Sequence, residues 1–278
     1  ATPVVALSAD APSPTLDLMP VPAQIELGTG AFEIDEGFAV SIQGDGAGPR
    51  LQRGVRRMLR RLSDRSTLFF GNETFLDLEN AEGASLRISA GRPGELIVGE
   101  DESYRLKIAE SGIELESATD IGALRGLETL LQLLRLDEHG VTLPSVDIRD
   151  EPRFPWRGLM IDSSRHFMPV AMVKRNLDGM AAVKLNVLHW HLVDDQAFRV
   201  ETRSMPRLHE LGSDGLYYTQ VQIREILDYA ADRGIRVVPE FDLPGHGSAW
   251  LAAYPELASA PGPFEIERSW GIFDPTIN

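Results

Sequence analysis

The chain has 278 residues, 43% of them hydrophobic, which is enough for one large or two medium-sized domains with a sizeable core. Its formal net charge of −15 argues against nucleic acid or an anionic membrane surface as a partner and is easier to reconcile with a small neutral ligand. The chain contains no cysteine, which excludes disulfides and thiol chemistry, and no apolar run approaches the length of a membrane span.

Residues 1–15 are rich in small residues and proline, with neither a basic start nor a long apolar run. This is not the pattern of a signal peptide. We expect a flexible leader that is left after export, so that an exported location, periplasmic or secreted, is favoured over a cytoplasmic one.

Residues 16–146 are expected to form a first domain of α+β type. Residues 39–42 predict a strand, and an amphipathic helix follows, with apolar residues at helical spacing between Leu51 and Leu62. Further strands are predicted at 86–90, 96–98, 104–108 and 112–117, and a leucine-rich helix at 121–136. Strands grouped with two helices on one face indicate an α+β sandwich, in which we recognise no chemistry.

The polar face of the first predicted helix carries five arginines, Arg50, Arg53, Arg57, Arg60 and Arg61. These guanidinium groups could form a patch that binds anions. In an otherwise acidic protein, we favour the alternative of a solvated helix face.

Residues 147–156 (DIRDEPRFPW) are predicted to be a linker, because prolines and charged residues interrupt any periodic pattern. After it, apolar strands alternate with amphipathic helices, one of which begins at a capping box formed by Thr219 and Gln222. The predicted strands are 158–162, 185–190 and 236–241. We therefore expect residues 157–278 to contain about three βα units with parallel strands and right-handed connections.

The stretch Lys184–Gln196, KLNVLHWHLVDDQ, is the most informative part of the chain. Side chains alternate along a strand, so we expect His189 and His191 to share one face and Trp190 to occupy the other. Asp194 and Asp195 follow at the carboxyl end of this strand, where parallel sheets and barrels bind ligands. Since adjacent side chains diverge, we expect only one of the two aspartates to lie in a site.

Polar residues also follow the two neighbouring strands, Asp162 with Arg165 and Asp242 with His246. Three interpretations are open for this convergence. The polar residues could merely satisfy one another, the histidines could bind a metal, or the carboxylates and an imidazole could form an acid/base or carbohydrate site. A guanidinium suits a pair of hydroxyls or an anion, and an aspartate beside a histidine can fix its tautomer.

Several blocks of the sequence together resemble the family-20 glycoside hydrolases, the β-N-acetylhexosaminidases. The matching blocks are RGLMIDSSRHF (157–167), KLNVLHWHLVDDQ (184–196), YYTQVQIREILDYAADRGI (217–235) and VVPEFDLPGH (237–246), and GALRGLETLLQLL (122–134) is similar to a helix of the family's non-catalytic domain. The resemblance covers nearly everything after Leu16.

The resemblance implies an eight-stranded (β/α) barrel behind the α+β domain, with residues 157–278 as its first part. It also implies exo-acting, retaining hydrolysis of terminal β-linked N-acetylglucosamine or N-acetylgalactosamine, in which the substrate's acetamido oxygen is the nucleophile. By position, Arg165 would bind hydroxyls of the sugar, Asp194 and His246 would orient the general acid, and His191 would support the pocket. We expect Asp194 to contact His246 and Asp195 to point away. No metal or cofactor belongs to this pattern.

The sequence departs from the family pattern, since it contains no Gly-Gly-Asp-Glu type motif to supply the general-acid glutamate and lacks most of the aromatic residues that wall the family's sugar pocket. A (β/α) barrel takes about 250 residues, and three strands cannot close it. We therefore expect a C-terminal continuation or fragment to complete the barrel, and the 278 residues alone to be inactive. The alternative is a catalytically inactive glycan-binding protein of the same fold.

Overall fold

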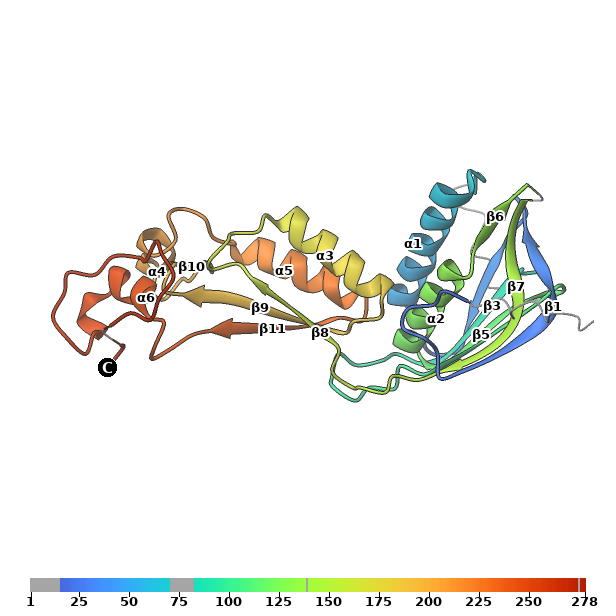
Figure 1. Cartoon of the computed structure of the whole chain (residues 1–278), viewed down its shortest axis with the longest axis horizontal. Helices are drawn as coiled ribbons and strands as arrows, with labels where there is room; N and C mark the ends of the chain where they lie inside the picture. The colour runs from blue at the N-terminus through green and yellow to red at the C-terminus, as the bar shows by residue number, and fades with distance from the viewer. Residues whose placement is uncertain (1–15, 71–82, 139, 275) are drawn as a thin grey trace, which may run out of the picture.

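The computed structural model describes residues 16–70, 83–138, 140–274 and 276–278. The leader predicted for residues 1–15 lies outside the described residues. Figure 1 shows two lobes arranged along the long axis, the first built on a mostly antiparallel sheet and the second on a parallel one. No helix in the described ranges is long and apolar enough to cross a bilayer.

The first lobe is a seven-stranded sheet in the order β1-β7-β4-β5-β3-β2, with β6 paired to β7. Its strands are β1 (Gln24–Ile34), β2 (Val40–Gln43), β3 (Leu86–Arg92), β4 (Tyr104–Ala109), β5 (Gly112–Thr119), β6 (Arg135–Asp137) and β7 (Gly140–Asp150). Helices α1 (Pro49–Ser66) and α2 (Asp120–Gln132) cover one face, where alternate residues of β3 and β4 are buried beneath them (Figure 1). The predicted α+β sandwich is confirmed.

The sequence-based boundaries are wrong at two places in this lobe. Residues 96–98, predicted as a strand, form a bend and a turn. The predicted linker 147–156 begins too early, because β7 continues through Asp150 and pairs there with β1 and β4. Neither of the 11-residue strands β1 and β7 was predicted. Glycines interrupt the pattern of β1, whose register with β7 shifts between Leu27 and Ala31, and Pro144 interrupts the pattern of β7.

The second lobe contains the three predicted βα units. Parallel strands β8 (Gly158–Asp162) and β11 (Arg236–Phe241) flank β9 (Val187–Asp194), and β10 (Ala197–Phe198) pairs with the end of β9. Helices α3 (Val170–Ala182) and α5 (Gln220–Ala231) pack together on one side of these strands (Figure 1). The shorter helices α4 (Arg207–Leu211), α6 (Ser248–Ala253) and η1 (Pro255–Leu257) lie beyond their carboxyl ends. The fold is the first part of a (β/α) barrel, as predicted.

Local sequence signals explain how these elements are placed. The capping box that opens α5 forms as predicted, since Thr219 and Gln222 each accept a hydrogen bond from the other's backbone N–H. Gly234 adopts a positive φ of 64°, which lets the chain turn from α5 into β11. On β9, Trp190 is buried against Tyr218 on the helix side of the sheet, whereas His189 and His191 both contact Glu240. The predicted alternation of faces is confirmed.

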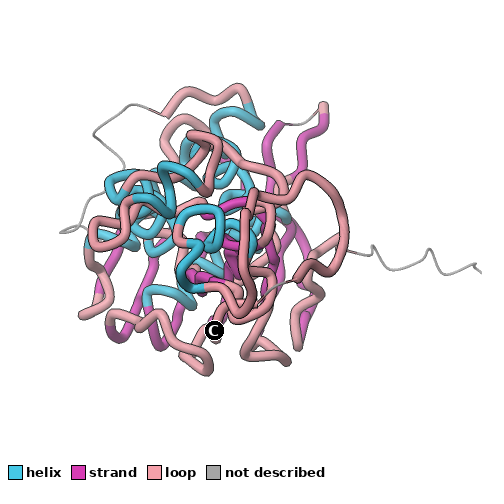
Figure 2. Tube along the Cα trace, turned by 90° about the vertical axis from the view of Figure 1, so that its left-hand side faces the viewer, coloured by secondary structure: helices cyan, strands magenta, loops and turns pink. Residues whose placement is uncertain are grey.

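Buried polar groups join the two lobes at the amino ends of β9 and β11. Glu102 of the first lobe accepts hydrogen bonds from Arg157 and from Asn186, the residue before β9. Arg125 of α2 donates to the carbonyl oxygens of Arg233 and Gly234, just before β11. These contacts fix the amino ends of the strands against the first lobe, so their carboxyl ends point away from it. Figure 2 views that end directly and shows mostly loop segments.

The arginine face of α1 is solvated only in part: Arg60 is exposed, as predicted, but most of the other arginines have partners on neighbouring elements. Arg50 pairs with Asp120 of α2, and Arg61 pairs with Glu128. Arg53 pairs with Asp232 of the second lobe, and Arg57 donates to the carbonyl oxygen of Asp232. These four arginines have partners because α1 packs beside α2 and next to the end of α5, where acidic side chains and carbonyl oxygens are available.

Candidate active site

The carboxyl ends of the three parallel strands bring their polar side chains together. In the register of the sheet, both Asp162 of β8 and Glu240 of β11 lie opposite His191 of β9. Arg165 and His246 follow β8 and β11 in the loops beyond these ends. The residues that sequence analysis selected on three separate strands therefore form one cluster.

Asp194 is at the centre of this cluster, and its side chain is completely buried. Its Oδ2 atom lies 2.9 Å from Nε2 of His191 and 2.5 Å from the Nη2 atom of Arg165. Its Oδ1 atom accepts the backbone N–H of Asp195 at 2.7 Å and lies 3.2 Å from Nδ1 of His246. The other three predicted site residues thus all contact the carboxylate of Asp194. Their roles in catalysis and substrate binding remain predictions.

The charges of this cluster stabilise one another. Burial alone would raise the pKa of Asp194, but the hydrogen bond from His191, followed by the Asp195 N–H and the charges of Arg165 and His246, holds that pKa below its ordinary value. Burial would lower the pKa of His191, but hydrogen bonds to Asp194 and Glu240 raise it to about 9. At neutral pH the pair is therefore a carboxylate and an imidazolium.

The imidazole of His191 is expected to titrate near pH 9 in the folded protein, well above the ~6.5 of an unperturbed histidine. Because the pKa is raised on folding, the stabilisation from protonated His191 is complete below about pH 6.5 and is lost as the pH rises through 9. An NMR titration of the histidine ring protons, assigned with a His191→Asn variant, measures this. A His191 ring that titrates at or below 6.5 would contradict the assignment of two carboxylate partners.

The expectation that Asp195 points away from His246 is wrong. The Oδ2 atom of Asp195 lies 3.1 Å from Nδ1 of His246, as close as Asp194 does. Its Oδ1 atom accepts hydrogen bonds from the backbone N–H and the hydroxyl of Ser248, at 3.0 and 2.7 Å. Strand alternation no longer applies here, because β9 ends at Asp194 and the chain turns immediately into β10. Both aspartates can therefore converge on one imidazole.

Arg165 is held in place by groups from two strand ends and is still partly exposed. Its Nη1 atom donates to Asp162 at 2.9 Å, its Nε atom donates to Gln196 at 3.1 Å, and its Nη2 atom pairs with Asp194. The side chain is 38% exposed. A guanidinium has five N–H donors, so two remain available to a ligand after these contacts with described residues.

Sequence analysis missed Glu240, which completes the cluster. Its Oε2 atom lies 2.6 Å from Nε2 of His189 and 2.8 Å from Nδ1 of His191. Burial raises the pKa of nearby Asp242, and the Glu240 carboxylate raises it further. Burial would also raise the pKa of Glu240, but the hydrogen bond and charge of His191, together with Asp242 and the charge of His189, lower it below its ordinary value. The sequence contained a signal for this contact, because both strands, 185–190 and 236–241, were predicted. Parallel pairing of the two strands could have placed Glu240 beside the histidines.

Two sets of donors in the cluster are close enough to hold a cation, His191 with Glu240 and Asp242, and Asp194 with Asp242 and His246. A histidine must be neutral to ligate a metal, whereas His191 lies between two carboxylates that keep it protonated. The Asp194 oxygens already contact Arg165, His191 and His246. The donors are thus arranged for hydrogen bonds to one another.

Two family models and curated relatives match the chain. The model for glycosyl hydrolase family 20, domain 2, matches residues 15–151, and the model for the catalytic domain of that family matches residues 154–276. The chain is 36% identical over 276 residues to a beta-hexosaminidase of Porphyromonas gingivalis, and this match covers 92% of this chain and 34% of that protein. It is 44% identical over 185 residues to beta-hexosaminidase subunit beta of Mus musculus, and this match covers 64% of this chain and 34% of that protein.

Solved structures show the same similarity. A chitobiase of Flavobacterium johnsoniae superposes with a TM-score of 0.91 at 50% identity and covers 95% of this chain and 40% of that one. The N-acetyl-beta-hexosaminidase of Streptomyces plicatus has a TM-score of 0.81 at 30% identity and covers 97% and 54%. The chain spans between a third and a half of the length of these curated relatives, 34% of the two named above and 45% of a beta-hexosaminidase subunit A1 of Dictyostelium discoideum. With both lobes matched by models of one family, the chain belongs to glycosyl hydrolase family 20.

Proposed function

We propose that this chain, once its barrel is completed, removes terminal β-linked N-acetylglucosamine or N-acetylgalactosamine from the non-reducing ends of oligosaccharides or glycoconjugates. The observation that carries this proposal is the buried Asp194 carboxylate, which joins Arg165, His191 and His246 at the carboxyl ends of parallel strands. Relatives named beta-hexosaminidase and chitobiase support it.

Arg165 would bind the terminal sugar. Its guanidinium is fixed by Asp162, Gln196 and Asp194, so little conformational freedom remains to be lost when a ligand binds. The two remaining N–H donors suit a pair of neighbouring hydroxyls, because the fork of a guanidinium has a fixed planar geometry.

In the retaining, substrate-assisted mechanism that we propose, the acetamido oxygen of the sugar attacks the anomeric carbon while the glycosidic oxygen leaves with a proton from a general acid. The role of His246 would be to orient that acid. Both Asp194 and Asp195 lie against its Nδ1 atom, which fixes the ring, and Nε2, which has no hydrogen bond to a described residue, could contact the acid. No Gly-Gly-Asp-Glu type motif occurs in the sequence, and we propose that the segment that completes the barrel supplies the glutamate.

Two features of the second lobe support completion by a continuation or a second polypeptide. Among the strands of the described ranges, β8 and β11 each pair with β9 alone, so each has one free edge. Leu159, Met160 and Phe241 on these strands are 36–49% exposed. Free edges and exposed apolar side chains favour association with further strands and helices.

Denaturing mass analysis of the purified protein, combined with an assay on an aryl β-N-acetylglucosaminide, tests this proposal. We expect a species larger than the calculated 30.7 kDa, or a second fragment, and release of the chromophore. A single active species of 30.7 kDa would contradict the proposed source of the acid. A complete and folded protein that binds chitin oligomers without hydrolysing the aryl glycoside would support the alternative of an inactive glycan-binding protein.

Replacement of Arg165 by lysine should lower kcat/KM by at least tenfold, about 1.4 kcal/mol, because an ammonium group cannot reproduce the guanidinium fork. The melting temperature should change little, since the positive charge beside Asp162 and Asp194 is retained. Arg203→Lys, at an exposed position without a partner among the described residues, is the matched control. Equal kinetics for both variants would remove Arg165 from the binding site.

A further inference from the structure

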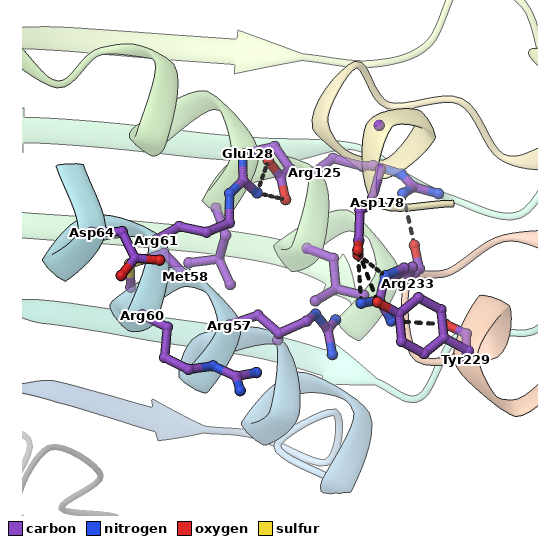
Figure 3. Close-up of a pocket in the computed structure, with 15 residues that line it drawn as sticks. Arg57, Met58, Arg60, Arg61, Asp64, Arg125, Glu128, Asp178, Tyr229 and Arg233 are labelled. Atoms are coloured by element: carbon purple, nitrogen blue, oxygen red, sulfur yellow. Dashed lines mark hydrogen bonds and ion pairs between the residues drawn. The ribbon is translucent and has the colours of Figure 1, made fainter. Parts of the chain in front are cut away.

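A pocket lies at the junction of the two lobes, between α1 and α2 on one side and α3 and α5 on the other (Figure 3). Its volume is about 580 Å³, within the range of small-molecule sites. Five arginines and three carboxylates line it, so it carries an excess of two positive charges in a chain whose net charge is −15. The five are Arg57, Arg60, Arg61, Arg125 and Arg233.

Three of these arginines already have carboxylate partners. Arg61 donates to both oxygens of Glu128 at 2.6 Å, and Arg233 pairs with Asp178 at 2.6 Å. Figure 3 shows both pairs. Arg125 pairs with buried Glu102 at 2.6 Å. The positive charges of these three arginines are balanced by their carboxylate partners, so they contribute little to the attraction of an anion.

Arg57 and Arg60 have no carboxylate partner among the described residues. Arg57 makes one hydrogen bond, to the carbonyl oxygen of Asp232 at 2.6 Å, and Arg60 makes none. Both side chains extend toward the same side of the pocket, where Arg233 lies (Figure 3). Burial, and then repulsion from Arg233, lowers the pKa of Arg57 to about 10, which is consistent with a guanidinium that lacks a counter-charge.

We propose that this pocket binds a phosphate or sulfate group, either as the free anion or as an ester on a small molecule, held by Arg57 and Arg60. Two unpaired guanidiniums match the charge of a doubly negative tetrahedral anion and can bind its oxygens through paired N–H donors. The anion would bridge the lobes, because Arg57 belongs to α1 and reaches the end of α5. The second-lobe residues that line the pocket belong to the carboxyl-terminal halves of α3 and α5 and to Arg233 after α5, and none of the Asp194 cluster lines it, so its ligand would be separate from the sugar proposed to bind near Asp194.

Isothermal titration of the intact protein tests the proposal, with inorganic phosphate, inorganic sulfate, glucose 6-phosphate and glucose, at an ionic strength held constant with sodium chloride. We expect saturable binding of the first three and none of glucose. Tighter binding of glucose 6-phosphate than of phosphate would identify an ester as the ligand, and equal binding would identify the free anion. The absence of saturable binding for all three anions would overturn the proposal.

Variants of α1 assign the binding to this pocket. Arg60→Gln breaks no hydrogen bond or ion pair among the described residues, so it should fold normally, and we expect it to weaken phosphate binding by about tenfold. Arg57→Gln with Arg60→Gln should abolish it. The control is Arg56→Gln, on the same helix but outside the pocket lining, which should bind as the unmodified protein does. Unchanged affinity in Arg60→Gln, or equal loss in Arg56→Gln, would place the anion elsewhere and overturn the assignment.

Discussion

Replacement of Asp194 by asparagine is expected to lower kcat/KM of the intact protein by on the order of a hundredfold or more, because several groups of the proposed site depend on one carboxylate. The amide cannot serve as a charged acceptor for Arg165, His191 and His246 together. The guanidinium of Arg165, proposed to bind the sugar, and the imidazole of His246, proposed to orient the general acid, would both lose their fixed positions.

The pH behaviour separates this role from a purely structural one. The hydrogen bond that His191 donates to Asp194 is the first of the interactions that raise the pKa of His191, so the asparagine variant should move the titration of His191 downward from about 9. NMR detects this shift, and initial rates measured from pH 5 to 9 should show a changed profile as well as a lower maximum. Asp214→Asn, which alters an exposed pair with Arg268, is the matched control. It should change neither the titration of His191 nor the dependence of the rate on pH. Near-normal activity in Asp194→Asn would refute the proposed arrangement.

The second lobe could be predicted from sequence because its local signals agree with its tertiary structure. The strand around Trp190 is apolar and buried, the capping box at Thr219 sets the start of α5, and Gly234 ends the turn before β11. Parallel strands then necessarily bring their carboxyl ends together. Asp194, Arg165, His191 and His246 could therefore be selected before any contact between them was known.

Other contacts depended on information that a single strand does not contain. Strand β1 was missed because it is stabilised by pairing with β7 across more than 100 residues of chain, whereas its own pattern is interrupted by glycines. Asp195 was misjudged because it lies in a turn, where strand alternation does not apply. The arginines of α1 were expected in solvent because their partners, such as Glu128 and Asp232, are on other elements.

Replacement of Glu102 by glutamine is expected to lower the free energy of unfolding by about 3–5 kcal/mol, the usual effect of breaking a buried ionic contact. The Glu102 side chain is 5% exposed, and its Oε2 atom accepts from Arg125 and from Arg157, both at 2.6 Å. Its Oε1 atom accepts from Asn186 at 2.7 Å, directly before β9. A neutral amide would leave two largely buried guanidiniums without a counter-charge at the junction between the lobes.

The effect should depend on pH with a defined sign. Burial alone would raise the pKa of Glu102, but Arg125 and Arg157 lower it below its ordinary value. The stabilisation is therefore fully present above the unfolded pKa, about 4.3, and is lost as the pH falls through the folded pKa. Urea unfolding at pH 7 should show the full difference between the unmodified protein and Glu102→Gln, and the difference should narrow below about pH 4.

Glu114→Gln is the matched control, because Glu114 pairs with Arg87 on the surface of the same lobe, where the two side chains are 49% and 34% exposed. Exposed pairs contribute about 0–1 kcal/mol, so this variant should unfold at nearly the same urea concentration as the unmodified protein. If Glu102→Gln is no less stable than Glu114→Gln at pH 7, the buried carboxylate does not hold the lobes together. The positions of β9 and β11 would then have to be fixed by the remaining contacts of Arg125 with the carbonyl oxygens of Arg233 and Gly234.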